Sequence, residues 1–306
     1  PHPLSSKSGR EVEAIMALTK RTRLASVTLL LTVAGLLAMP ALSIAQGDLM
    51  RVRDAVRNGS DDDDDDDDDH HHRRRRHHHH HDHCDDDSGL DSAIGELIGY
   101  VITSPFWGPH AAVDQGYDVP GYFNSGPYSN GCCGLMQIGG YDQPPNHLTR
   151  FDVEYAFDFD DLERMGGRLL WEDTCRIGVD ASLNYFQEDL PAGDDDLWLG
   201  DANAVFRFAQ CETLVMRAGV GINWMADNQR GDAGINFTYG ADWFPAEPLV
   251  FSTEFDVGTL GDAGLFHGRA TVGVVRDQVE IYTGYDYYNV GGTGLGTFIA
   301  GLRVWF

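Results

Sequence analysis

Apolar and polar residues alternate along the second half of the chain with the period of two that is typical of β-strands with two unlike faces. In the run from Leu214 to Trp224, for example, every second residue is apolar, and Arg217, Gly219 and Asn223 lie between them. The pattern predicts ten strands, at 150–158, 167–173, 176–186, 199–210, 213–225, 232–244, 248–259, 265–275, 279–288 and 297–306. Most have about the ~9–11 residues that a tilted strand needs to cross a bilayer.

The connections between these strands alternate in length. Short ones fall at 173–175, 211–212, 245–247 and 276–277, and longer Gly- and Asp-rich ones at 159–166, 187–198, 226–231, 260–264 and 289–296. Short periplasmic turns and long outer loops are typical of an outer-membrane barrel. The fold class we predict is therefore all-β, with residues 150–306 forming one closed antiparallel transmembrane β-barrel of about ten strands. Both ends of its wall, and the segment before it, are expected on the periplasmic side.

The polar face of the predicted strands indicates which side meets lipid. It is rich in Gly, which weakens an exposed strand but leaves room for long neighbours in a crowded interior. Both signs of charge are present on it, and buried charges need partners. We expect ion pairs in the lumen among Arg168, Arg207, Arg217, Arg269, Arg303, Glu254, Asp256, Glu280 and Asp286. Apolar and polar residues would also alternate along the strands of a soluble lipocalin-like barrel with a ligand cavity, so this fold is the alternative.

The last strand, Thr297–Phe306, ends in Leu302-Arg303-Val304-Trp305-Phe306. Together with the export signal described below and the short turns, it resembles small outer-membrane barrels of the OmpA, OmpX and opacity-protein type. The resemblance is architectural and covers residues 150–306. It implies that Phe306 is the signal read by the barrel-assembly machinery. Ten strands instead of eight, and the acidic, His-rich segment before the barrel, depart from that pattern.

Four segments precede the barrel. Residues 1–15 have no pattern and are expected to be untranslated upstream sequence. Residues 16–45 predict a signal peptide, with basic residues at Lys20, Arg21 and Arg23, an apolar run and a small-residue end at Ala45. Residues 46–87 predict a disordered acidic and His-rich segment. Residues 88–149 predict a short helix at 88–103, followed by an irregular Gly-, Pro- and Tyr-rich segment.

The formal net charge of −26 argues against a nucleic-acid partner. Within the disordered segment, imidazoles that suit divalent metals occur at His70, His71, His72, His77, His78, His79, His80, His81 and His83. No spacing among them fixes a coordination geometry. We therefore expect no cofactor, apart from a weakly bound divalent metal, and the sequence does not indicate an oligomeric state.

Catalysis is not expected. The barrel's candidate base, His267, follows an outer loop that contains Asp262, but a lone His at a barrel mouth is more often a hydrogen-bonding residue of the interior. Asp194, Asp195 and Asp196 could bind Ca²⁺, although a solvated acidic loop explains them as well.

Five cysteines in an exported chain suggest disulfides. Cys175 and Cys211 fall at the inner ends of neighbouring strands and form a candidate bridge, although their strand faces differ. The sequence thus predicts an outer-membrane barrel with a structural or narrow-pore (porin-like) role, lipid and the barrel-assembly machinery as partners, and no enzyme activity. Metal binding by the periplasmic N-terminal segment and, least favoured, hydrolysis at the outer rim are further alternatives.

Overall fold

The computed structural model describes residues 47–59, 108–111, 113–114, 121–139, 146–191 and 193–306. The predicted signal peptide, the His-rich tract and the helix predicted at 88–103 lie outside these residues. No helix among the described residues is long and apolar enough to cross a membrane.

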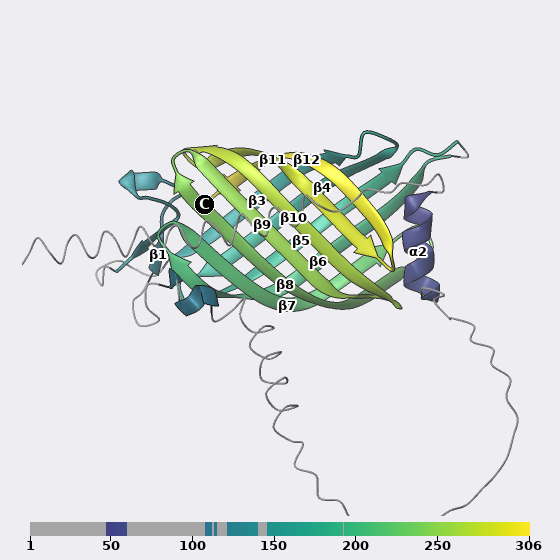
Figure 1. The fold of residues 1–306 in the computed structure, drawn as a ribbon, viewed down its shortest axis with the longest axis horizontal. Helices are drawn as coiled ribbons and strands as arrows, with labels where there is room; N and C mark the ends of the chain where they lie inside the picture. Colours follow the sequence, from purple (N-terminus) through teal and green to yellow (C-terminus); the bar gives the residue numbers. More distant parts are fainter. Residues whose placement is uncertain (1–46, 60–107, 112, 115–120, 140–145, 192) are drawn as a thin grey trace, which may run out of the picture.

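Ten antiparallel strands form a closed barrel, as the sequence predicts (Figure 1). Neighbours along the chain pair with one another, and β12 pairs with β3 to close the wall. The strands are β3 (His147–Phe157), β4 (Leu162–Asp173), β5 (Ile177–Glu188), β6 (Asp195–Cys211), β7 (Leu214–Ala226), β8 (Gly231–Ala246), β9 (Leu249–Leu260), β10 (Ala263–Arg276), β11 (Val279–Val290) and β12 (Thr293–Trp305).

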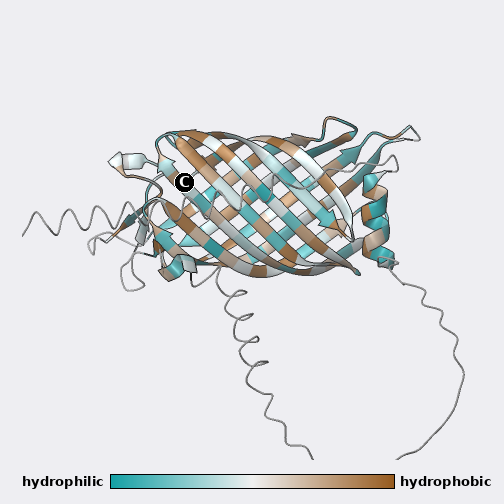
Figure 2. Ribbon diagram, viewed as in Figure 1, coloured by the Kyte–Doolittle hydropathy of each residue, from teal (hydrophilic) through white to brown (hydrophobic). Residues whose placement is uncertain are grey.

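Apolar and polar residues alternate along the strands of the wall (Figure 2). Every strand leaves at least two large apolar side chains exposed on the outside. On β3, for example, Phe151, Val153 and Tyr155 point outward, whereas Asp152 and Glu154 between them are buried. The charged side chains therefore face the lumen and the apolar ones face outward.

The connections differ from the prediction in length. At one end of the barrel they span 158–161, 189–194, 227–230, 261–262 and 291–292, so the last two are as short as the turns at the other end. Gly291 and Gly292 both have positive φ, as a two-residue type I′ hairpin requires. The Gly-rich composition that suggested loops at 260–264 and 289–296 belongs to tight turns there.

A small hairpin covers the end of the barrel at which the C-terminus lies, which we call the hairpin end (Figure 1). It consists of β1 (Gly121–Phe123) and β2 (Met136–Ile138). Phe123, Leu135 and Met136 pack with buried side chains of the wall, including Phe244 and Trp305. The backbone N–H of Leu135 also donates to the carbonyl of Glu212, 3.2 Å away, in the β6–β7 turn.

The helix α2 (Asp48–Asn58) covers the opposite end, which we call the helix end (Figure 1). Leu49, Val52, Ala55 and Val56 form its buried stripe and pack on apolar side chains of the wall. Disorder was therefore the wrong prediction for this part of 46–87, whose spacing of apolar residues is helical. Its position also differs from the prediction, because the connections at this end are those assigned to the outer side.

Candidate functional site

The lumen is the part of the molecule where polar chemistry is concentrated, and it contains two ion-pair networks. The hairpin-side network lies above β1–β2 and contains four arginines and four carboxylates. Its members are Arg150, Arg207, Arg217, Arg303, Asp152, Glu172, Asp242 and Glu280. Arg217, for instance, contacts Asp242 at 2.7 Å and Glu172 at 3.1 Å. Charge is balanced in this network.

The helix-side network lies toward α2. Its cations are Arg164, Arg168, Arg269 and His267, and its carboxylates are Glu154, Asp180, Asp201, Glu254, Asp256 and Asp286. Asp201 joins the network through amide hydrogen bonds of Asn203 and Asn236. The carboxylates thus outnumber the cations by two even when His267 is protonated.

Several pairs connect opposite sides of the wall. In the ring of ten strands, β8 is five positions from β3 and β9 is five positions from β4. Arg150 of β3 reaches Asp242 of β8 at 3.1 Å, and Arg168 of β4 contacts Glu254 of β9. These side chains therefore span the full width of the lumen.

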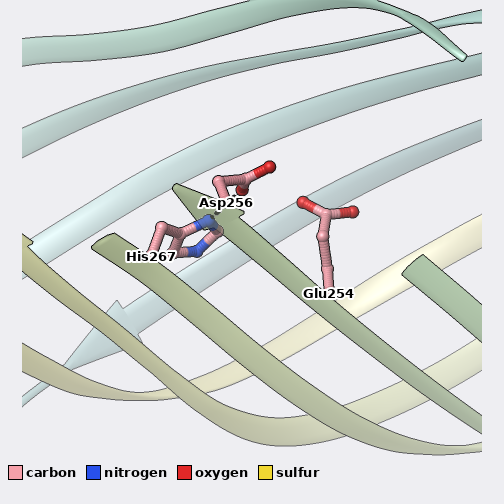
Figure 3. A group of neighbouring side chains, drawn as sticks. All are labelled: Glu254, Asp256 and His267. Atoms are coloured by element: carbon pink, nitrogen blue, oxygen red, sulfur yellow. Dashed lines mark hydrogen bonds and ion pairs between the residues drawn. The ribbon is translucent and has the colours of Figure 1, made fainter. Parts of the chain in front are cut away.

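His267 of β10 lies between two carboxylates. Its Nδ1 is 2.6 Å from Asp256 Oδ2, and its Nε2 is 2.6 Å from Asp286 Oδ1. The ring of Tyr288 stacks on the imidazole at a centroid distance of 4.0 Å. Figure 3 shows Glu254 and Asp256 on the adjacent strand β9, both projecting into the interior with His267. Both ring nitrogens are therefore occupied, and the imidazole has no free edge for a substrate.

All nine charged residues predicted for the lumen are buried there. Eight of them have a partner of opposite charge, and Asp256 contacts His267. The sequence analysis missed Arg150 and Arg164, which are also buried and paired. Arg164 had been assigned to a loop because β4 begins five residues before its predicted start. Continuing the period of two backward from Arg168 would have identified it.

Charged groups also hold α2 at the helix end. Both oxygens of Glu188 accept backbone N–H bonds from the first turn, at 2.8 Å from Asp48 and 3.1 Å from Leu49. Arg53 donates to both oxygens of Asp195, at 3.1 and 2.9 Å. Asp195, one of the three acidic residues considered for Ca²⁺, therefore has an arginine as its partner. Asp227 forms an ion pair with Arg53, whose Nε is 2.6 Å from its Oδ2, and accepts a hydrogen bond from Arg57 at 2.8 Å.

The pKa values of two carboxyls at this end move in opposite directions. Burial, followed by the charge of Glu188, raises the pKa of Asp48. Burial also acts to raise the pKa of Asp227, but hydrogen bonds from the backbone N–H groups of Gln229 and Arg230 and from Arg57 outweigh it and hold this pKa below its ordinary value.

Little space remains between the networks. One cavity, lined in part by Asp201, Asp256 and His267, has a volume of about 10 Å³. A second, lined in part by Arg168, Arg217 and Asp242, has a similar volume of about 10 Å³. Each is on the order of the smallest space that holds one water molecule.

The disulfide predicted between Cys175 and Cys211 was wrong, because both are free thiols, as are Cys132 and Cys133. Strand β6 has a bulge between Phe206 and Ala209 and continues beyond Phe206, the partner of Ile177 at the start of β5. Cys211 is therefore carried past the exposed β4–β5 turn that contains Cys175.

The remaining predicted site residues lie apart from the lumen. Phe306 is 59% exposed, and its backbone exchanges two hydrogen bonds with Thr149, of 2.8 and 3.1 Å, at the hairpin end. The histidines at 70–83 lie outside the described residues.

No protein-family model and no curated protein matches the chain. Solved structures similar to it are outer-membrane barrels. They include the KdgM porin (9% identity, 51% of this chain and 99% of that one, TM-score 0.32). The outer membrane protein Ail of Yersinia pestis is 14% identical, over 53% of this chain and 100% of its own, with a TM-score of 0.31. The outer membrane protease OmpT of Escherichia coli is 10% identical, over 53% of this chain and 94% of its own, with a TM-score of 0.31. At these identities the similarity concerns the fold alone.

Proposed function

We propose that this protein is a structural barrel of an outer membrane, with a filled lumen that does not conduct ions and with no catalytic activity. The observation that carries the proposal is the distribution of side chains on the wall. Apolar side chains are exposed on the outside of all ten strands, and charged side chains are buried inside. Soluble monomers rarely expose apolar patches larger than a few hundred Å². Lipid is the solvent in which such a surface is stable.

The filled lumen favours a structural role over a pore. Barrels of about eight strands are closed by their own side chains, and ten strands add little space. Here the pairs Arg150–Asp242 and Arg168–Glu254 cross the lumen, and the β1–β2 hairpin packs over one end. A hydrated ion moving through would have to separate several buried ion pairs.

Planar-bilayer recording on the purified full chain tests this role. We expect no stable conductance steps for the wild type. The double variant Arg150→Ala/Asp242→Ala removes one pair that crosses the lumen, together with both of its charges. Comparing its conductance with that of the wild type tests whether loss of this pair opens a path for ions through the lumen. Large, stable, ion-selective steps in the wild type would contradict the proposal and make the protein a porin.

The absence of catalysis is supported by the surroundings of His267. A general base needs an accessible ring nitrogen within hydrogen-bond reach of a substrate, whereas both nitrogens of His267 contact carboxylates. We expect no turnover of peptide or lipid substrates by the full chain. Turnover that His267→Ala abolishes would overturn this part of the proposal.

We also propose that Phe306 directs assembly by the barrel-assembly machinery, as the resemblance to small outer-membrane barrels implies. Its ring is exposed at the end of the wall, so it is available to a partner. Deletion of Phe306 should lower the amount of protein in the outer membrane and raise its periplasmic degradation. Replacement of the exposed Phe159, at the other end of the barrel, by Ser is the control and should leave assembly unchanged. Normal membrane levels without Phe306 would contradict this role.

A further inference from the structure

The unequal charge of the two networks is the starting point. The hairpin-side network has four arginines for four carboxylates, whereas the helix-side network has six carboxylates for three arginines and one histidine. Buried charge without a counterion is costly. Metal binding would leave His267 neutral, so the six carboxylates would then face three arginines, and a divalent cation would offset most of this excess.

Suitable ligand atoms meet in the same network. Glu254, Asp256 and His267 each offer one atom, and the three atoms lie within 4.8 Å of one another (Figure 3). All three side chains are buried. Asp256 and His267 also line the cavity of about 10 Å³ beneath α2, which has room for one small ion or water.

The groups around His267 would hold its ring in the orientation and tautomer that a metal ligand needs. A metal-bound histidine usually donates its second ring N–H to a carboxylate, which fixes the tautomer and the ring orientation. Asp286 Oδ1 can accept this hydrogen bond from Nε2 over 2.6 Å, and the stacked Tyr288 holds the ring in place. The lone pair of Nδ1 then points toward Asp256.

A buried amide provides a separate indication. Asn236 is fully buried, and its Nδ2 donates to Asn203 and, at 3.4 Å, to Asp256. Its Oδ1 has no hydrogen-bond partner. A buried carbonyl oxygen left unsatisfied is unfavourable, and a water molecule bound to a cation at Asp256 would offer it a partner.

We propose that Glu254, Asp256 and His267 bind one divalent transition-metal ion of the Zn²⁺ class. The ion would replace the proton between His267 Nδ1 and Asp256 Oδ2, so binding releases one proton. With metal–nitrogen and metal–oxygen distances of about 2.0–2.2 Å, two tetrahedral ligand atoms lie about 3.3–3.6 Å apart, so His267 Nδ1 and Asp256 Oδ2 would move apart from 2.6 Å by somewhat less than about 1 Å. Arg168 keeps Asp180 as its partner when Glu254 turns to the ion. A nitrogen ligand disfavours Ca²⁺ and Mg²⁺, which take oxygen ligands.

Metal titration of the purified full chain tests the site, with Zn²⁺ for stoichiometry and Co²⁺ as a spectroscopic probe. We expect the His-rich tract to bind metal as well, so the measured quantity is the difference between variants that share it. We expect the wild type to bind one equivalent more than His267→Gln, and to show a Co²⁺ absorption band that His267→Gln lacks. Thr271→Val, an isosteric change on the same face of β10, should keep both. Asp286→Asn should weaken binding about 10–100-fold, as loss of a hydrogen bond to a ligand does.

Equal stoichiometry and identical Co²⁺ spectra in the wild type and His267→Gln would overturn the proposal, as would displacement of Co²⁺ by equimolar Ca²⁺. Heat-modifiable gel mobility checks that each variant is folded. If His267→Gln does not fold, Glu254→Gln takes its place, and a wild-type Co²⁺ spectrum unchanged by Glu254→Gln would also overturn it.

Discussion

Single residues on neighbouring strands of this barrel are matched in size. Gly301 of β12 lies beside Tyr282 of β11, whose hydroxyl donates to Glu154 over 2.8 Å. A methyl group at Gly301 would overlap the Tyr282 ring. The glycines that the sequence analysis assigned to the lumen thus include positions where a long neighbour needs the space.

Replacement of Gly301 by Ala is therefore expected to destabilise the barrel by about 1–3 kcal/mol, the usual cost of overpacking. Urea unfolding of the purified protein, followed by gel mobility, measures the loss. Gly264→Ala on β10 is the control, because no atom lies within 4 Å of the added methyl group. Equal stability of Gly301→Ala and the wild type would show that the lumen is less tightly packed than described.

The pair Arg269–Glu154 allows a test of the buried charges. The guanidinium of Arg269 donates to both oxygens of Glu154, at 2.7 and 2.5 Å. Arg269→Met should destabilise the barrel by about 1.5–3 kcal/mol, because Glu154 loses both hydrogen bonds from Arg269 and keeps only Arg164 and Tyr282 as partners. The double variant Arg269→Met/Glu154→Gln should recover part of this loss in the same unfolding assay. A double variant less stable than Arg269→Met would contradict the pairing.

The period of two was enough to predict which residues face the lumen, because a strand alternates regardless of what it packs against. It could not predict partners. Arg168 and Glu254 are 86 residues apart in sequence, and they meet only because β4 and β9 lie opposite each other in a ring of ten. The contacts of His267 are of a different kind, since Asp256 and Asp286 reach it from the two sequence-neighbouring strands that flank β10, in a register that the sequence alone does not fix.

At the scale of elements, strand number was predictable and the lengths of connections were not. Gly-rich stretches were assigned to loops, whereas Gly261 and Gly291 are in tight turns. The structure gives a second reason for these glycines, because a Cβ at Gly261 would overlap the backbone of Val56, and one at Gly291 would overlap Ala55. α2 therefore lies so close to these two turns that a Cβ would not fit. This contact is between distant parts of the chain, so the local sequence does not predict it.

The docking of α2 depends on its buried stripe. Val52 is fully buried against the wall, so Val52→Asp would place a carboxylate in an apolar site at a cost of several kcal/mol. Because each ~1.4 kcal/mol changes an equilibrium tenfold, trypsin cleavage after Arg53 and Arg57 in detergent should rise at least tenfold. Met50→Asp is the control, because Met50 is 58% exposed. Equal cleavage of the two variants would show that the helix is not held by this face.

The pH dependence of docking follows from Asp227. Its pKa in the folded protein is below the ordinary value of 3.8, so its ion pairs contribute fully above that value and are lost as pH falls through the lower one. The raised pKa of Asp48 has the opposite sign and favours docking slightly on acidification. Hydrogen-exchange protection of Asp48–Asn58, corrected for intrinsic rates, should therefore hold from pH 8 to about 5 and fall below about pH 3.8. A midpoint near pH 6, or a low-pH step that survives Asp227→Asn, would contradict this account.

At the scale of the whole molecule, the two covers lie at opposite ends of the barrel. Residue 59 ends α2 at the helix end, and residue 121 begins β1 at the hairpin end. The hairpin packs over one end of the lumen and α2 over the other, and the two ion-pair networks fill the space between them. In membranes we expect these networks to keep the lumen closed.

The central claim is that lipid surrounds the wall, and alkaline carbonate extraction of membranes from cells that make the full chain tests it most directly. We predict that the protein stays in the sedimented outer-membrane fraction and migrates faster on gels before heating than after. Recovery in the soluble fraction, still folded, would contradict the claim and favour a lipocalin-like barrel.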